Sequence, residues 1–174
     1  KVPSTRNDIL AKRFGIPMSG YTFFFTYEET RPYRRHTYSG MACALGADLS
    51  QGDDFCSFDF LFPLRNGGFG NYVRSYITEN TLKNLRPEMR IKYDEFLAEG
   101  SLVVMPGVIL NIDDPNADHC VYDDLVDFIN RSDYHVMALG YDPYNAKEFV
   151  RRWTQEYSEF GVVKVPQGAR TESV

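Results

Sequence analysis

The stretch YHVMALGYDPYNAKEFVRRWTQEYSEFGVVKV, residues 134–165, decides the fold of this 174-residue chain. It begins with a mostly apolar run over 134–142, which predicts a strand. Residues 144–160 repeat apolar side chains at helical spacing and are followed by Gly161, so they predict a four-turn amphipathic helix. A second strand is predicted over 162–165. Strand, helix and strand in this order form a βαβ unit with two parallel strands. The buried face of the helix is expected to hold Ala146, Phe149, Val150, Trp153, Tyr157 and Phe160.

The segments before this unit predict an antiparallel meander. Residues 41–48, MACALGAD, are a nearly continuous apolar run, which is typical of a central strand buried on both faces. Residues 55–63 alternate between aromatic and polar or small side chains, as a strand with one buried face does. The glycine-rich turn 65–70 then leads into a third strand over 71–77.

Between the meander and the βαβ unit the apolar spacing changes to that of helices. A helix is predicted from Pro87, which fits the first helical position, to Gly100, which ends it. A short strand is predicted over 102–107, and a second helix around 125–129. A meander followed by βαβ gives an α/β domain with a mixed β-sheet flanked by α-helices, the outline of a ribonuclease-H-like fold.

Composition limits the class of protein. Hydrophobic residues make up 43% of the chain, enough for one domain with a real core. No apolar run approaches the ~20 residues that a membrane span needs, so no membrane partner is expected. The three cysteines are widely spaced, which fits neither a disulfide framework nor a zinc site and favours an intracellular compartment. The net charge of −5 argues weakly against a simple nucleic-acid-binding module.

Two aspartates stand where strands end. Asp48 is the first polar residue after the apolar run 41–48, and Asp142 ends the strand 134–142 in the same way. If these strands are parallel neighbours, both carboxylates lie at one edge of the sheet, where functional groups of α/β folds gather. There they are able to bind the two divalent ions that assist phosphodiester cleavage, with Mg²⁺ or Mn²⁺ preferred by hard oxygen ligands. The alternative is that both simply cap the turns that follow.

Other acidic residues give weaker signals. Asp53 and Asp54 lie between the first two strands, where one of them is placed to reach the same metal, although both are also ordinary turn residues. The run 111–120, NIDDPNADHC, contains three aspartates but lacks the glycine and glutamate that an EF-hand loop requires. A surface loop that caps a helix is the favoured interpretation of this run.

The ordered set of motifs resembles the C-terminal nuclease domain of the large terminase subunit of tailed bacteriophages. GADLS at 46–50 resembles the end of that family's first strand, and Asp54 resembles the nearby acid. YDEFLAEGSLVVMPG at 93–107, GYDPYNA at 140–146 and VVKVPQGARTESV at 162–174 resemble the next motifs in the same order. The resemblance covers residues 40–174, and the last 35 residues are its most specific part.

The resemblance implies a metal-dependent DNA endonuclease that cleaves concatemeric DNA during packaging. It implies Asp48 and Asp142 as catalytic metal ligands, with Asp54 as an auxiliary acid and two Mg²⁺ or Mn²⁺ ions as cofactors. Its implied partners are double-stranded DNA, the terminase ATPase domain, the small terminase subunit and the portal, in the cytoplasm of the bacterial host. Contacts to DNA are expected from Lys164, Arg170, Arg34 and Arg35.

The resemblance also sets the expected domain organisation. Residues 1–40 are expected to be a lead-in from an ATPase domain that this chain lacks, and 41–174 to be the ribonuclease-H-like nuclease domain. The family's further catalytic aspartate has no counterpart after Gly168, so a truncated C-terminus is expected. The alternative function is a catalytically silent docking module of the packaging motor that binds the portal or the ATPase domain. A transposase or resolvase of the same fold does not account for the motifs over 140–174.

Overall fold

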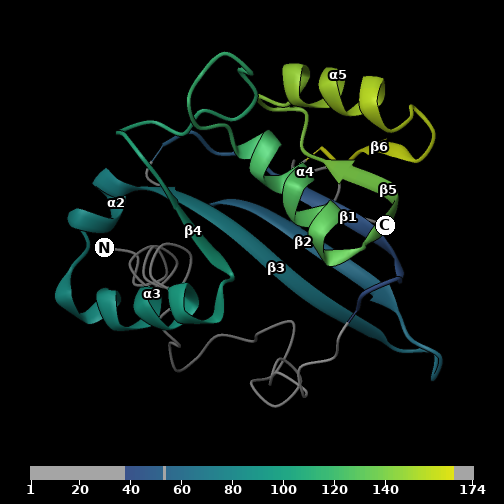
Figure 1. Ribbon diagram of the computed structural model, residues 1–174, viewed down its shortest axis with the longest axis horizontal. Coiled ribbons are helices and arrows are strands. Elements are labelled where there is room, and N and C mark those ends of the chain that lie inside the picture. Colours follow the sequence, from purple (N-terminus) through teal and green to yellow (C-terminus); the bar gives the residue numbers. More distant parts are fainter. Residues whose placement is uncertain (1–37, 53, 167–174) are drawn as a thin grey trace, which may run out of the picture. The chain divides into compact units, whose positions relative to one another are not determined.

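The computed structural model describes residues 38–52 and 54–166, which build a six-stranded sheet in the order β4-β3-β2-β1-β5-β6 (Figure 1). No helix within these ranges is long and apolar enough to cross a membrane. The strands are β1 (Ala42–Asp48), β2 (Cys56–Pro63), β3 (Phe69–Thr78), β4 (Leu102–Met105), β5 (His135–Tyr141) and β6 (Val162–Lys164). The helices are α2 (Glu79–Lys83), α3 (Pro87–Glu99), α4 (Val121–Ser132) and α5 (Lys147–Glu156).

The sheet is mixed, as the sequence predicts. β2 runs antiparallel to both of its neighbours, β1 and β3, which confirms the meander. β5 and β6 are parallel and are joined by α5, which confirms the βαβ unit. β5 also pairs in parallel with β1, and β4 pairs in parallel with β3 at the far edge. The central pair β1 and β5 therefore brings the ends of two strands that are distant in sequence to one edge of the sheet.

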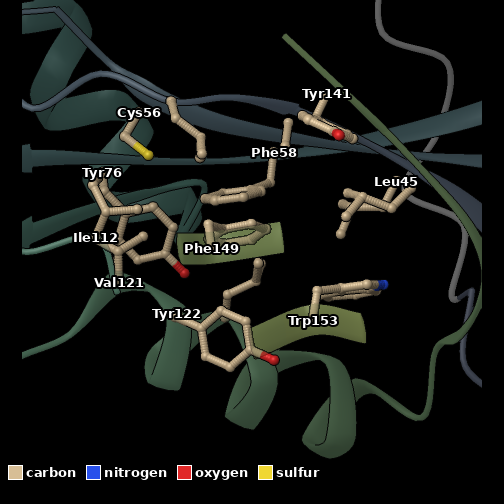
Figure 2. Close-up of a cluster of buried hydrophobic side chains, with 14 of the residues drawn as sticks. Leu45, Cys56, Phe58, Tyr76, Ile112, Val121, Tyr122, Tyr141, Phe149 and Trp153 are labelled. Carbon is tan, nitrogen blue, oxygen red and sulfur yellow. The ribbon is translucent and has the colours of Figure 1, made fainter. Parts of the chain in front are cut away.

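The hydrophobic core lies between one face of this sheet and the helices α4 and α5. Phe58 of β2 stacks on Phe149 of α5, with ring centroids 5.6 Å apart, and Tyr122 of α4 meets the edge of Phe149 at 5.2 Å (Figure 2). These three side chains are fully buried, as are Phe60 and Phe62 of β2. Aromatic rings of this size remove a large apolar area from water, and their contacts fix the position of α5 on the sheet.

The expectation that β1 is buried on both faces is wrong. Its residues alternate, with Cys43, Leu45 and Ala47 buried and the residues between them exposed. The exposed positions hold alanine, glycine and Asp48. Alanine and glycine count as apolar in a sequence pattern, but they have little surface to bury, so the pattern wrongly predicted a second buried face. The sheet face that carries Asp48 is therefore accessible in the described part of the chain.

The helix predicted over 144–160 is shorter than expected. α5 begins at Lys147, because residues 142–146 form a turn, and it ends at Glu156. Phe149 and Trp153 are buried as predicted, and Lys147 is exposed. Phe160, expected on the buried face, is 88% exposed because the chain has left the helix before reaching it. Tyr157 is 37% exposed and stacks on Trp153.

The region between β3 and β4 holds one predicted helix and one that the sequence did not indicate. α3 starts at Pro87 and ends with Gly100 in the left-handed conformation, as predicted. The short α2 was not predicted; it follows β3 directly, and the Thr78 hydroxyl accepts a hydrogen bond from the Thr81 backbone N–H to cap it. Tyr93 of α3 stacks on Phe55, just before β2.

Candidate metal centre at the carboxyl ends of β1 and β5

The pairing of β1 with β5 places Asp48 and Asp142 side by side along the edge of the sheet. The two strands are parallel, and Ala47 is in register with Tyr141. Asp48 follows Ala47 and Asp142 follows Tyr141, so each aspartate occupies the next position at the carboxyl end of its strand. Neighbouring strands lie about 4.8 Å apart, so the two backbones at this level are close. The spacing of the two carboxylates stays a prediction.

The surroundings of the two aspartates suit a cation. Asp48 is exposed and Asp142 is half-buried, and neither belongs to an ion pair among the described residues. The backbone N–H of Tyr144 donates a hydrogen bond of 3.0 Å to Asp142 Oδ1, which fixes that carboxylate against the turn before α5. Two carboxylates without a lysine or arginine partner form a donor set of hard oxygens, which fits Mg²⁺ or Mn²⁺.

Two glycines that sequence reasoning did not assign lie beside these carboxylates, and the space next to one of them, Gly46, is open. Gly46 and Gly140 are paired in register, two residues before Asp48 and Asp142 respectively. A Cβ atom added at Gly46 would meet only the carbonyl oxygen of Asp59, at 3.8 Å. In the sequence, the two glycines could have been found from the spacing that GADLS and GYDPY share, in which a glycine stands two residues before the aspartate. The sheet is therefore open next to Asp48, whereas the Val165 side chain faces Gly140 on the strand that leads to Asp142.

Asp54 is on the other side of β1 from Asp142 in the strand order. It precedes β2, which adjoins β1 on the side away from β5. Burial, and to a smaller extent the charge of Asp54, raise the pKa of Tyr93 in α3, so this carboxylate lies near that helix. Over residues 38–52 and 54–166, no three His, Cys, Asp or Glu side chains are grouped to hold a metal. The structure thus brings the strand ends that carry Asp48 and Asp142 to one edge, and the role of Asp54 stays a prediction.

The loop between β4 and α4 lies at the same edge of the sheet. The backbone N–H of Leu110 donates to the carbonyl of Gln51, three residues after Asp48. The Asn111 side chain closes the loop by donating to the carbonyls of Asp114 and His119. This confirms a surface loop, although Cys120, the residue that precedes α4, provides no side-chain cap.

A residue of α5, Arg152, binds the loop between β4 and α4. Arg152 donates to the carbonyl of Asp113 and forms an ion pair of 2.6 Å with Asp123 of α4. Its guanidinium also lies over the ring of Tyr122 at 4.0 Å. Burial, followed by the charge of Glu148, raises the pKa of Asp113. The loop is therefore fixed to both helices that pack on the sheet.

The predicted DNA contacts are only partly within the described structure. Lys164 of β6 is exposed and in register with Tyr141, which places it one strand away from Asp142 at the same edge. Arg34, Arg35 and Arg170 lie outside the described residues. Lys164 is thus the predicted basic residue whose position relative to the carboxylates is known.

The comparisons with known proteins all point to the large terminase subunit. The sequence model of the family described as terminase large subunit, endonuclease domain, matches residues 3–173. The terminase large subunits of Lactococcus phages p2 and SK1 are each 22% identical to this chain over 143 residues. These matches cover 81% of this chain and 25% of each relative, so the chain spans about a quarter of their length.

One solved structure has the same fold. The crystal structure of the HK97 bacteriophage large terminase matches this chain with a TM-score of 0.58 at 20% sequence identity. The match covers 75% of this chain and 26% of that one. The mixed sheet with its helices is thus a fold that a large terminase contains.

Proposed function

Because this chain belongs to the family of terminase large subunit endonuclease domains, we propose that it is a metal-dependent endonuclease that cleaves concatemeric phage DNA during packaging. The observation that supports this most is the parallel register of β1 and β5, in which the last pair, Ala47 and Tyr141, directly precedes Asp48 and Asp142. Double-stranded DNA is the proposed substrate, and the terminase ATPase domain, small subunit and portal are the proposed partners.

In this proposal Asp48 and Asp142 hold Mg²⁺ or Mn²⁺. A metal held by these two carboxylates would supply the activation of water and the stabilisation of charge on the phosphate. Asp142 Oδ1 accepts a hydrogen bond from the Tyr144 N–H, which favours one orientation of this carboxylate. Gly46 leaves room on the adjacent sheet face for the sugar-phosphate backbone, whereas Gly140 faces the Val165 side chain. Lys164 lies on β6, in register with Tyr141, and a contact from it to a DNA phosphate, which would position DNA without reading its sequence, stays part of the proposal. A role for Asp54 as an auxiliary acid stays part of the proposal.

Plasmid cleavage tests the function directly. Supercoiled plasmid incubated with the protein and Mn²⁺ is expected to be nicked and linearised, and a chelator is expected to stop the reaction because the carboxylates alone do not activate water at neutral pH. The products are resolved on an agarose gel. Intact plasmid in Mn²⁺ and in Mg²⁺, with the protein folded, would contradict the proposal and favour the docking module.

The open sheet face gives a second prediction. Gly46→Val is expected to lower the cleavage rate on the order of tenfold, because a branched side chain would displace DNA from the carboxylates. Stability should change little, since the added Cβ meets no close neighbour and valine suits a strand. Ala44→Val is the matched control, as Ala44 lies on the same exposed face one pair further from the edge. Equal rates for both variants, measured on plasmid, would show that this face is not used by DNA.

A further inference from the structure

Ser57 of β2 is the cross-strand neighbour of Asp48, on the side of β1 away from β5. The two strands are antiparallel, and Asp48 is in register with Ser57. The preceding pair, Ala47 and Phe58, is buried in the core, so Asp48 and Ser57 lie on the open face, the sheet face turned away from α4 and α5. Residues opposite each other on one face of an antiparallel pair have Cβ atoms about 4.5–5.5 Å apart. The Ser57 side chain is therefore adjacent to a candidate metal ligand.

A second serine on the next strand holds the Ser57 hydroxyl. Ser75 of β3 is in register with Ser57, and the two Oγ atoms are 2.9 Å apart, which is a hydrogen bond. Both side chains are half-buried, so the pair is still reached from solvent. The residue in register with Ser75 on β4, Leu102, is buried. The polar row thus runs from Asp48 across Ser57 and ends at Ser75.

The two hydroxyls together keep one hydrogen free to donate. Each serine hydroxyl has one hydrogen and two lone pairs, so the bond between them uses one hydrogen and leaves the other. When Ser75 donates to Ser57, the remaining hydrogen belongs to Ser57, beside Asp48. A hydroxyl that accepts one hydrogen bond donates the next one more strongly, because linked hydrogen bonds polarise each other. Ser57 is in this way prepared to donate to an anion at the carboxyl end of β1.

A DNA phosphate is the anion that suits this donor. A lysine or arginine beside Asp48 would pair with that carboxylate and compete with a metal ion, whereas a neutral hydroxyl donates without adding a charge. Serine hydroxyls regularly donate to phosphate oxygens in protein–DNA complexes. One strand spacing of about 4.8 Å separates Ser57 from Asp48. One oxygen of a phosphate is therefore able to meet the hydroxyl while another faces a metal on Asp48.

We propose that Ser57 donates a hydrogen bond to a phosphate of the DNA strand that is cut, and that Ser75 is a positioning residue that orients the Ser57 hydroxyl. This inference rests on the proposed function, because it needs DNA at the edge that carries Asp48. It adds a residue of β2 to a site otherwise formed by the ends of β1 and β5. The alternative is a serine pair that only stabilises the sheet, as cross-strand hydroxyl pairs do.

DNA binding without cleavage is the first measurement. The probe is a fluorescein-labelled duplex in Ca²⁺, a hard cation that carboxylates also bind, and the readout is fluorescence anisotropy. Ser57→Val is expected to weaken binding about tenfold, because a hydrogen bond to a charged group is lost. Ser57→Thr keeps a hydroxyl in a side chain of the same shape as valine, so it should bind within about twofold of wild type. Both residues suit a strand, so the comparison isolates the hydroxyl.

The positioning role of Ser75 has its own variants. Ser75→Ala is expected to weaken binding about threefold, since the Ser57 hydroxyl then loses its orienting partner, and Ser75→Thr is expected to restore it. Ser132→Ala is the matched control, because Ser132 is also half-buried but ends α4 at the amino end of β5, away from Asp48. Its affinity for the duplex should equal that of wild type.

Plasmid cleavage and metal binding separate a DNA contact from a metal or structural role. In Mn²⁺, Ser57→Val is expected to raise KM about tenfold and to change kcat less than about threefold, because the contact is made both before and during the reaction. The increase in melting temperature on adding Mn²⁺ should be the same for Ser57→Val and wild type, since Ser57 is not proposed as a metal ligand. A purely structural pair would change stability without this selective effect on KM.

Three results would overturn the inference while leaving the proposed function in place. These are a wild-type enzyme that cleaves plasmid with equal DNA affinity and KM in Ser57→Val, a threonine variant as weak as the valine variant, and a smaller Mn²⁺ response in Ser57→Val, which would assign the hydroxyl to Asp48. A folded wild type that cleaves in neither Mn²⁺ nor Mg²⁺ would contradict the proposed function instead. The anisotropy of the variants would still decide whether Ser57 contacts DNA, and a wild type that does not bind the duplex would end the inference as well.

Discussion

Asp48→Asn is expected to reduce plasmid cleavage in Mn²⁺ by roughly a thousandfold or more, the scale of losing a group that stabilises charge in a transition state. The fold should not suffer. Asp48 and Asp142 follow an in-register pair on adjacent parallel strands, and two nearby carboxylates repel each other when no metal is present. Removing one charge relieves that repulsion, so the melting temperature of the metal-free variant should hold steady or rise.

Melting curves with and without Mn²⁺ complete this prediction. The wild type should gain stability from the metal by mass action, about 2.7 kcal/mol at a hundredfold excess over Kd, and the variant should gain less. Asp118→Asn, on the exposed loop before α4, is a control that should melt and respond to metal as the wild type does. If Asp48 only caps a turn, its substitution instead lowers stability by about 0.5–2 kcal/mol and neither protein responds to Mn²⁺.

The parts of the fold that were predictable are those with strong periodicity. The face of α5 with Phe149 and Trp153 repeats every three to four residues, and β2 alternates strictly, so both were assigned correctly. Helix length was less predictable, since the turn at 142–146 and the departure of the chain after Glu156 depend on local hydrogen bonds. That is why Phe160 was expected inside and lies at the surface.

The candidate site was predictable to the extent that it depends on strand ends. Asp48 and Asp142 each follow an apolar run, and that local signal located them correctly at the carboxyl ends of β1 and β5. The position of Asp54 depends on which side of β1 the second strand pairs and on the packing of α3, which no local pattern encodes. Gly46 and Gly140 are evident in the sequence, but their pairing depends on the register between two strands that are far apart in sequence, which no local pattern predicts.

A buried polar network, also absent from the sequence prediction, ties β3 to α4. Arg74 forms an ion pair of 2.5 Å with Asp124, and the Tyr76 hydroxyl donates to the same carboxylate oxygen at 2.8 Å. The Arg74 side chain is only 10% exposed and lies over the ring of Phe128 at 4.4 Å. Burial on its own lowers the pKa of Arg74, while Tyr76 and Asp124 raise it, and the net effect is a rise. The guanidinium therefore stays charged inside the protein and needs its partner.

Asp124→Ala is expected to lower the free energy of unfolding by about 3 kcal/mol, because it leaves the charge of Arg74 buried without a counter-ion and deprives Tyr76 of its acceptor. We place the value at the lower end of the usual ~3–5 kcal/mol because the Asp124 side chain is still 29% exposed. In a chain of this size the melting temperature should fall by roughly 6–12 °C. Urea denaturation gives the free energy, and Asp127→Ala, an exposed position on the same helix, should change it by less than about 0.5 kcal/mol.

The double variant Arg74→Met with Asp124→Leu removes both charges and should be more stable than Asp124→Ala alone, since no unpaired ion is left inside. A double variant as unstable as the single one would mean that packing at this position, and not the unpaired guanidinium, sets the loss.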